Sequence, residues 1–304
     1  MIDVSRIVRD LPQRVRVVEV GPRDGLQNEP VHLDTATRVE FIDRLSACGF
    51  DNIEAVSFVA PAWVPRMAGA AEVLGGIARR PGTRYTALVP NARGLVDALS
   101  AGADEIAVFP AASEAFSKRN LNASIAESLR RIEPVCATAL DQGVRVRGYV
   151  SCAFGCPYEG PIAPRAVAAL ARQLRDLGCY EIALGDTIGI ATPATVAAVL
   201  EAIDLPPAQL AVHLHDTRGQ ALVNIFTALS AGIAVIDSAV AGLGGCPYAI
   251  GASGNVATED LLYLLHGLGI ETGIDLDRVI DAGQFICDRL GRPSASKVAR
   301  ATPR

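Results

Sequence analysis

The stretch VVEVGPRDGLQNE, residues 17–29, begins as a buried strand and ends in polar side chains. Three valines in its first four residues favour a strand, and Gly21 and Pro22 end the run. Arg23 and Asp24 follow at once, and further polar residues come close behind. A cation and a carboxylate directly after a buried strand predict that this strand end faces a functional site.

Short β-branched and apolar runs recur along the chain, and each is followed by a longer segment with helical spacing. The predicted strands cover residues 16–20, 52–56, 84–88, 104–109, 145–150, 180–184, 210–214 and 234–239. Their starts lie roughly 20–40 residues apart, which is the length of one βα unit. Several intervening helices end on glycine, as expected for C-terminal capping.

This alternation predicts a single (β/α)8 TIM barrel. A doubly wound open sheet is the alternative, but it would more usually hold six strands, and no G-x-G-x-x-G opens the first helix. Residues 256–304 read as extra C-terminal helices, and no linker or low-complexity segment divides the chain. We therefore expect one catalytic domain over residues 1–304, with a helical appendage. Active sites of this fold lie at the C-terminal ends of the strands, where Arg23 and Asp24 are expected.

The composition excludes several classes of protein. Half of the residues are hydrophobic and 20% are charged, which suits a large core. The net charge is −5, and no dense basic run with interleaved aromatic residues is present, so nucleic acid binding is not expected. No apolar stretch reaches the length of a membrane span, so no membrane partner is expected either.

The cysteines and the N-terminus indicate a cytoplasmic protein. An odd count of seven cysteines argues for reduced thiols rather than a disulfide scaffold. Cys152 and Cys156 have no second cysteine pair at a finger-like distance, so a structural zinc site is not expected. The opening residues MIDVSRIVRD contain acids and no apolar h-region, unlike a signal or transit peptide.

Two histidines at the end of a predicted strand are candidate metal ligands. His213 and His215 lie in AVHLHDTRGQ, and residues at i and i+2 of a strand point to the same face. Alone, such a pair is more often a hydrogen-bonded structural pair. Their position at a strand end, and the presence of only four histidines in the chain, favour the metal.

The segment after the last predicted strand is rich in glycine. Residues 241–255, AGLGGCPYAIGASGN, contain Cys246 and end at Asn255. The glycines allow close approach to a ligand or movement of the loop. A flexible connector is the alternative, but it would not require a cysteine between Gly245 and Pro247.

The first, seventh and eighth strands are neighbours in a closed barrel, so their terminal side chains can meet. The predicted metal ligands are Asp24, His213, His215 and Asn255. One carboxylate oxygen, two imidazole nitrogens and one amide oxygen leave about two octahedral positions open. This donor set favours Mg²⁺ or Mn²⁺ over a closed thiolate zinc site.

Other strand ends also carry polar residues. Glu54 lies inside an apolar strand, where an unpaired acid is costly to bury. A structural salt bridge to Arg23 is one explanation, and it can coexist with a catalytic role. Further candidates for substrate contacts are Gln27, Ser57, Tyr149, Ser151 and Thr187, and Asp186 is a further acid.

These segments resemble the 3-hydroxy-3-methylglutaryl-CoA (HMG-CoA) lyase family, over about residues 14–300. The similar segments are VEVGPRDGLQNE, SFVAPAWVP, GYVSCAFGCPYEG, LGDTIG, HLHDTRGQA and AGLGGCPYAIGASGNVATED. This family belongs to the metal-dependent barrel superfamily that also holds isopropylmalate and homocitrate synthases. GLGGCPYA and RDGLQNE are the segments most specific to the lyases.

The resemblance implies retro-Claisen cleavage of HMG-CoA to acetyl-CoA and acetoacetate, as in leucine degradation. It implies that Arg23 stabilises the enolate, that Cys246 acts as general acid, and that Asp24 ligates the metal. It further implies supporting roles for Glu54 and Asp186. The group that takes the hydroxyl proton is left open among Asp24, Asp186 and His213. A homodimer or other homo-oligomer is expected.

Two positions depart from the family pattern. Many relatives carry a basic residue where this chain has Ala62, and threonine where it has Val56. Val56 ends the second predicted strand and Ala62 follows it, so a longer branched substituent at C3 of the substrate is an open alternative. The CoA phosphates also need cationic partners, and with only two lysines, arginines must supply them.

Two other functions remain as alternatives. The first is an acetyl-CoA-condensing synthase of the same superfamily, but such enzymes usually carry Glu in place of Leu26. The second is a non-catalytic metal-binding barrel, which would explain the metal ligands but neither Arg23 nor Cys246.

Overall fold

Eight parallel strands close into a barrel in the computed structural model. The structure describes residues 10–60, 62–246 and 249–302, without the side chains of residues 246–253. The strands are β1 Arg16–Glu19, β2 Asn52–Ser57, β3 Arg84–Leu88, β4 Glu105–Val108, β5 Arg145–Val150, β6 Glu181–Asp186, β7 Leu210–Leu214 and β8 Val235–Ser238. They follow one another in sequence order, and β8 pairs with β1 to close the barrel, with Val18 opposite Asp237. The predicted TIM barrel is confirmed.

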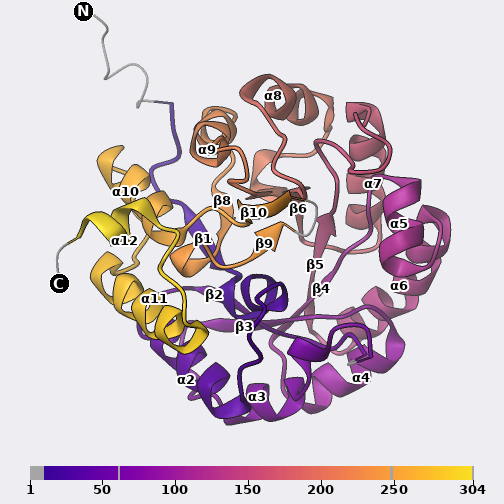
Figure 1. Cartoon of the computed structure of the whole chain (residues 1–304). Helices are drawn as coiled ribbons and strands as arrows, with labels where there is room; N and C mark the ends of the chain where they lie inside the picture. Colours follow the sequence, from indigo (N-terminus) through magenta and orange to yellow (C-terminus); the bar gives the residue numbers. More distant parts are fainter. Residues whose placement is uncertain (1–9, 61, 247–248, 303–304) are drawn as a thin grey trace, which may run out of the picture.

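Helices surround the strands (Figure 1). The helices of the barrel are α2 Thr35–Ser46, α3 Ala70–Gly76, α4 Ala92–Ser100, α5 Glu114–Leu121, α6 Ile125–Asp141, α7 Pro164–Asp176, α8 Pro193–Ala202 and α9 Ala221–Ser230. Glycines follow several of them in the left-handed conformation, as at Gly102 with φ of 80° after α4. Helix α6 begins with a reciprocal capping box between Ser124 and Glu127.

The strands are buried almost throughout, because one face contacts the helices and the other fills the barrel. Every residue of β2, β4, β6, β7 and β8 is buried. Two strands run further than the sequence predicts: β2 ends at Ser57, and β6 ends at Asp186, which still pairs with Leu214 on β7. These two polar residues are therefore held by the sheet rather than by loops.

The C-terminal segment is helical, as predicted. It contains α10 Thr258–Gly267, α11 Leu276–Leu290 and α12 Lys297–Ala301. These helices lie together beside β1 and α2 (Figure 1). No helix in the described ranges is long and apolar enough to cross a membrane.

The glycine-rich segment after β8 contains a hairpin that the sequence analysis did not predict. A short helical turn, Val240–Gly242, precedes the antiparallel strands β9 Gly245–Cys246 and β10 Ala249–Ser253. At its base the N–H of Gly254 donates to the carbonyl oxygen of Gly244 across 2.8 Å. A Cβ atom on Gly254 would lie 2.4 Å from that oxygen, so the glycine permits the backbones to approach.

Candidate functional site

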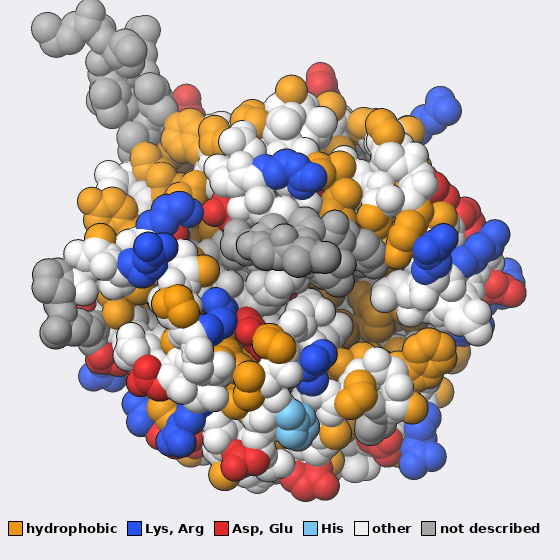
Figure 2. Space-filling model, in the orientation of Figure 1, with side chains coloured by type: hydrophobic (Ala, Val, Ile, Leu, Met, Phe, Trp, Pro, Cys, Tyr) orange, Lys and Arg blue, Asp and Glu red, His pale blue; other side chains and the backbone are white. Residues whose placement is uncertain are grey.

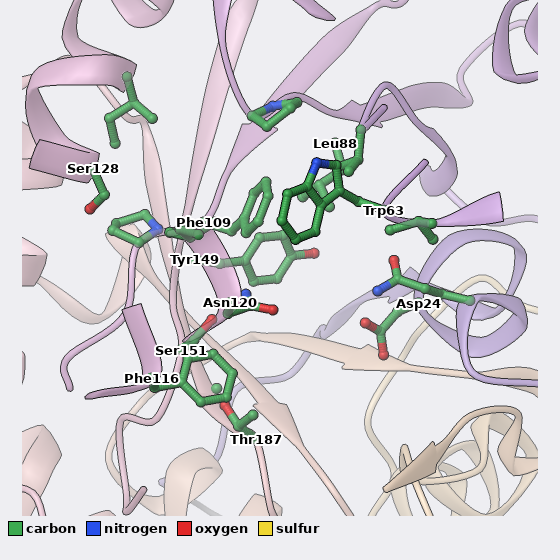
Figure 3. A pocket seen from close by; sticks show the side chains of 18 of the residues that line it. Asp24, Trp63, Leu88, Phe109, Phe116, Asn120, Ser128, Tyr149, Ser151 and Thr187 are labelled. Atoms are coloured by element: carbon green, nitrogen blue, oxygen red, sulfur yellow. The ribbon is translucent and has the colours of Figure 1, made fainter. Parts of the chain in front are cut away.

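A cavity of about 640 Å³ lies where the C-terminal ends of the strands meet. Its lining includes the predicted metal ligands Asp24, His213 and His215. The predicted substrate-contacting residues that also line it are Arg23, Gln27, Tyr149, Ser151 and Thr187. In Figure 3, Tyr149 lies in the middle of the lining residues, with Asp24 towards one side and Ser128 at the other.

A tight turn after β1 presents Arg23 and Asp24 to the cavity. In the turn Gly21–Gly25, the backbone N–H groups of Arg23, Asp24 and Gly25 all donate to the carbonyl oxygen of Val20. The chain therefore reverses within one turn of the strand end. Arg23 and Asp24 therefore line the cavity at the mouth of the barrel, while the valines before them are buried.

Asp24, His213 and His215 form a group that could hold a metal ion. One ligand atom from each residue lies within 4.8 Å of the others. His213 Nε2 lies 3.8 Å from Asp24 Oδ2. His215 keeps a buried Nδ1 with no hydrogen-bond partner among the described residues. An unpaired buried nitrogen beside a carboxylate fits a site that a cation completes.

The protonation states also suit metal binding. Burial and the neighbouring His213 lower the pKa of His215 to about 4, so this imidazole is neutral near pH 7. Burial opposes ionisation of Asp24, but Arg23, the two histidines and the hydrogen bond from Asn255 together outweigh it and lower the pKa of Asp24 well below its usual range. A neutral imidazole and an ionised carboxylate are the forms that bind cations.

Asn255 contacts the same group. Its Nδ2 donates to Asp24 Oδ2 across 2.8 Å and to the carbonyl oxygen of Leu243 across 3.2 Å. Its backbone also pairs with His215. The predicted convergence of strands 1, 7 and 8 therefore places Asn255 beside Asp24, and its role as fourth ligand stays a prediction.

Arg23 is fixed by two carboxylates. Its Nε donates to Glu54 Oε1 across 2.6 Å, and Nη1 donates to Asp24 Oδ1 across 2.7 Å. The other oxygen of Glu54 accepts from the hydroxyl of Tyr149. The expected salt bridge between Glu54 and Arg23 is thus present, and it holds the guanidinium at the cavity wall.

Four predicted site residues are not among the described residues that line the cavity: Glu54 and Asn255, which hold Arg23 and Asp24 as described above, and Asp186 and Ser57. Both carboxylate oxygens of Asp186 accept backbone N–H groups, from Ile190 and Ala191, each across 3.0 Å. Burial raises the pKa of Asp186 to about 6. Ser57 accepts the N–H of Val59 across 3.3 Å. These contacts hold loops, and the predicted roles of both residues stay untested. The side chain of Cys246 lies outside the described residues.

Sequence reasoning missed a buried ionic group behind the site. Asp237 accepts from Arg147 through both oxygens and lies 3.1 Å from His213 Nδ1, while Arg147 also contacts Glu181. Burial opposes ionisation of Asp237, but the charge of Arg147 and the hydrogen bonds with Arg147 and His213 together outweigh it and lower this pKa to about 2. All three ionic residues lie inside predicted apolar strands, the same signal that singled out Glu54.

Comparison with known proteins agrees with this geometry. The family model described as HMGL-like matches residues 14–286. The chain belongs to the HMGL-like family. It is 58% identical over 294 residues to the cytoplasmic 3-hydroxy-3-methylglutaryl-CoA lyase of Rattus norvegicus, covering 96% of this chain and 86% of the relative. It is 56% identical to a 3-hydroxy-3-isohexenylglutaryl-CoA/hydroxy-methylglutaryl-CoA lyase of Pseudomonas aeruginosa, and the match covers 96% of this chain and 98% of the relative.

Solved structures of HMGL-like relatives share the architecture. The hydroxymethylglutaryl-CoA lyase of Pseudomonas aeruginosa superposes with a TM-score of 0.94 at 56% identity, covering 96% of this chain and 98% of that one. An HMG-CoA lyase of Acinetobacter baumannii, solved in complex with coenzyme A and 3-methylmalate, gives a TM-score of 0.90 at 37% identity, covering 96% of each chain.

Proposed function

We propose that this HMGL-like chain is a divalent-metal-dependent carbon–carbon lyase that cleaves HMG-CoA to acetyl-CoA and acetoacetate. The observation that carries the proposal is the group Asp24, His213 and His215, which lines one cavity together with the buried Arg23. A metal site beside a fixed cation suits a reaction in which negative charge develops on two substrate oxygens. The names of the relatives indicate the same reaction.

The proposed metal is Mg²⁺ or Mn²⁺, held by Asp24, His213, His215 and Asn255. Mixed oxygen and nitrogen donors without thiolate support this choice. When bound, such an ion would supply Lewis acidity that lowers the pKa of the C3 hydroxyl of the substrate.

In the proposed reaction a base takes the C3 hydroxyl proton and the C2–C3 bond breaks. The bonding pair moves to C2 and the thioester as an enolate, and C3 becomes the ketone of acetoacetate. Arg23 donates to the thioester oxygen as charge develops there. Glu54 and Asp24 fix its guanidinium beforehand, so little reorganisation is needed. Protonation at C2 then yields acetyl-CoA.

The cavity lining favours two of the three candidate bases. Asp186 is not among the described residues that line the cavity. Asp24 and His213 both line the cavity. We therefore propose Asp24 or His213 as the group that receives the proton, and Cys246 as the acid that protonates the enolate.

Arg119 and Arg131 are the proposed partners of the CoA phosphates. Both are exposed and line the cavity, far in sequence from the metal group. Asn120 and Asn122 line the same part and add further hydrogen-bonding groups. Figure 2 shows the mouth face of the molecule, where Lys and Arg side chains lie around the rim.

A longer C3 substituent is a second candidate specificity. The cavity wall contains an apolar set: Val59, Trp63, Val64, Leu88, Phe109 and Phe116. Figure 3 shows Trp63, Leu88, Phe109 and Tyr149 among the side chains that line the cavity. A methyl group alone does not require so much apolar surface, and the Pseudomonas relative is named for both substrate sizes.

The test is acetoacetate-type product release from a panel of 3-hydroxy-3-alkylglutaryl-CoA esters. We expect turnover of HMG-CoA, the panel member with a methyl group at C3. The kcat/KM values of the other members decide whether longer C3 substituents are accepted. Turnover of no ester, with condensation of acetyl-CoA onto a 2-oxo acid instead, would reassign the chain to a synthase.

Three further proposals rest mainly on the resemblance. Residues 1–304 form one catalytic domain, since Glu259 and Asp260 of α10 accept hydrogen bonds from Ala241 and Ser296 and so join the barrel loops to the C-terminal helices. The chain assembles as a homodimer or other homo-oligomer, which light scattering tests. The proposed compartment is the cytoplasm, although relatives include a mitochondrial enzyme of Macaca fascicularis.

A further inference from the structure

Arg147 lies inside the barrel and contacts both halves of the site. Its side chain is 1% exposed. Nη2 donates to Asp237 Oδ1 across 2.7 Å, and Nη1 donates to Asp237 Oδ2 across 3.0 Å and to the hydroxyl of Tyr149 across 2.7 Å. Nε donates to Glu181 Oε1 across 2.8 Å. Only the planar fork of an arginine satisfies these three partners at once.

The first route from Arg147 leads to His213. Asp237 Oδ2 lies 3.1 Å from His213 Nδ1, and an ionised carboxylate can only accept. Nδ1 therefore carries the hydrogen, and the lone pair of the neutral ring is on Nε2, 3.8 Å from Asp24 Oδ2. Partners of this kind fix the tautomer and orientation of histidine ligands.

The second route leads to Arg23. The hydroxyl of Tyr149 accepts from Arg147 and donates to Glu54 Oε2 across 2.6 Å. Glu54 Oε1 then accepts from Arg23 Nε, and Arg23 Nη1 donates to Asp24 Oδ1. The two routes end on either side of one carboxylate, since Asp24 faces both Arg23 and His213.

We propose that Arg147 is a positioning residue that couples the metal half of the site to the oxyanion half, an inference that rests on the proposed lyase function. Through Asp237 it sets the tautomer of His213, and through Tyr149 and Glu54 it sets the position of Arg23. The alternative is a purely structural cluster, whose loss would lower stability without changing metal affinity or the imidazole tautomer.

Two variants separate the routes with little change of shape. Asp237→Asn removes the anion that His213 and Arg147 share, and we expect Mn²⁺ affinity, measured by electron paramagnetic resonance, to fall by about 10–100-fold. Tyr149→Phe removes the hydroxyl that links Arg147 to Glu54 and leaves Asp237 in place, and we expect kcat to fall about tenfold or more with Mn²⁺ affinity within about twofold of wild type. Arg147→Lys should show both losses.

A double variant tests the coupling. If Asp237 carries the effect of Arg147 on the metal, Arg147→Lys should weaken Mn²⁺ binding little further in the Asp237→Asn protein. The matched control is Glu105→Gln. Glu105 is equally buried and accepts from Asn52 and Thr86, and none of its hydrogen bonds within the described part of the chain reaches Asp24, His213 or His215. This control should lower stability and leave Mn²⁺ affinity unchanged.

The tautomer of His213 gives a readout that needs neither metal nor activity. The chain has four histidines, so ¹⁵N-labelled protein gives a spectrum that His32→Gln and His266→Gln variants help to assign. We expect an Nδ1–H signal for His213 in metal-free wild type and its loss or mixing in folded Asp237→Asn. An unchanged tautomer together with unchanged Mn²⁺ affinity overturns the proposal, even where Arg147→Lys does not fold. Wild type that binds no Mn²⁺ overturns the proposed function instead, and the tautomer then still tests the positioning.

Discussion

The hydroxyl of Tyr149 on β5 lies 2.6 Å from Oε2 of Glu54 on β2 and donates a hydrogen bond to it. Because the other oxygen of Glu54 accepts from Arg23, both oxygens of this carboxylate are occupied. Glu54 is therefore better suited to hold Arg23 in place than to exchange a proton with a substrate.

Glu54→Gln should weaken both stability and catalysis. The neutral amide cannot balance the buried charge of Arg23, so we expect the free energy of unfolding to fall by on the order of 1–3 kcal/mol, measured by urea denaturation. The control Glu40→Gln removes the exposed pair with Arg44 and should change stability by less than about 0.5 kcal/mol. Equal effects of the two variants would contradict this reading of Glu54.

Removal of divalent metal should abolish activity. We expect a chelator to stop turnover, and Mg²⁺ or Mn²⁺ to restore it. Asp24→Ala or His213→Ala should raise the metal concentration needed for half-maximal activity, because each removes one of the proposed ligands. His266→Ala, on α10, serves as the control. Full activity in metal-free protein would exclude the proposed mechanism.

Arg23→Lys should lower kcat far more than it changes KM. Lysine keeps a charge but loses the fork that contacts Glu54 and Asp24 together. If Arg23 stabilises the enolate, kcat should fall by about 10²–10³, the loss typical of removing one oxyanion donor. Steady-state kinetics on HMG-CoA measure this, and a normal kcat with a raised KM would assign Arg23 to ground-state binding.

Cys246→Ser should lower kcat by roughly 10²–10⁴, because a hydroxyl is far too weak an acid to replace the thiol. Mn²⁺ affinity should not change, since no proposed ligand is removed. Alkylating agents should inactivate the wild type, and a substrate analogue should protect it. Cys48→Ser replaces a buried cysteine that follows the C-terminal end of α2 and is not among the described residues that line the cavity, so it serves as the control. Alkylation of Cys246 without loss of activity would show that the thiol only packs.

Stability should fall as pH rises through the neutral range. Burial raises the pKa of Glu19 to about 7 and that of Glu259 to about 8, from an ordinary value of 4.5. Between pH 4.5 and 8 these two carboxyl groups therefore bind more protons in the folded state than in the unfolded state. Each group can lower the free energy of unfolding by at most about 1.4 kcal/mol per pH unit over its range.

Glu259→Gln should flatten this dependence, because the amide can still accept from Ala241 but does not titrate. Urea unfolding at several values between pH 5 and pH 8 measures the slopes. Identical slopes for the wild type and the variant would show that Glu259 does not titrate in the folded protein.

The sequence predicted the elements that repeat and missed those that depend on distant partners. Strand β3 was placed at its observed bounds, because apolar runs and turn residues are local signals. The hairpin of β9 and β10 escaped prediction, since its pairing depends on the close approach of Gly244 and Gly254. The metal group was predictable because barrel closure brings strands 1, 7 and 8 together.

The residues that hydrogen-bond to the proposed metal ligands were harder to predict than the ligands themselves. Arg147 and Asp237 lie 90 positions apart, and only the closed barrel shows that they share hydrogen bonds. The contacts of Asp186, for which the family resemblance implied a supporting role, were equally hard to predict. Its oxygens accept from Ile190 and Ala191 in the following loop, a contact that local spacing does not reveal.

The seam between β1 and β8 has a consequence for how the protein is made. Asp24 and Asn255 are separated by 231 positions, so a chain leaving the ribosome carries the first proposed ligand long before the last. During most of translation the metal site is incomplete, so a bound cation cannot help the first strands of the barrel to fold. Metal binding would then stabilise only the completed barrel. At free metal concentration [L] and dissociation constant Kd it would raise the free energy of unfolding by RT ln(1 + [L]/Kd), and this stabilisation would become available only after synthesis of the last ligand.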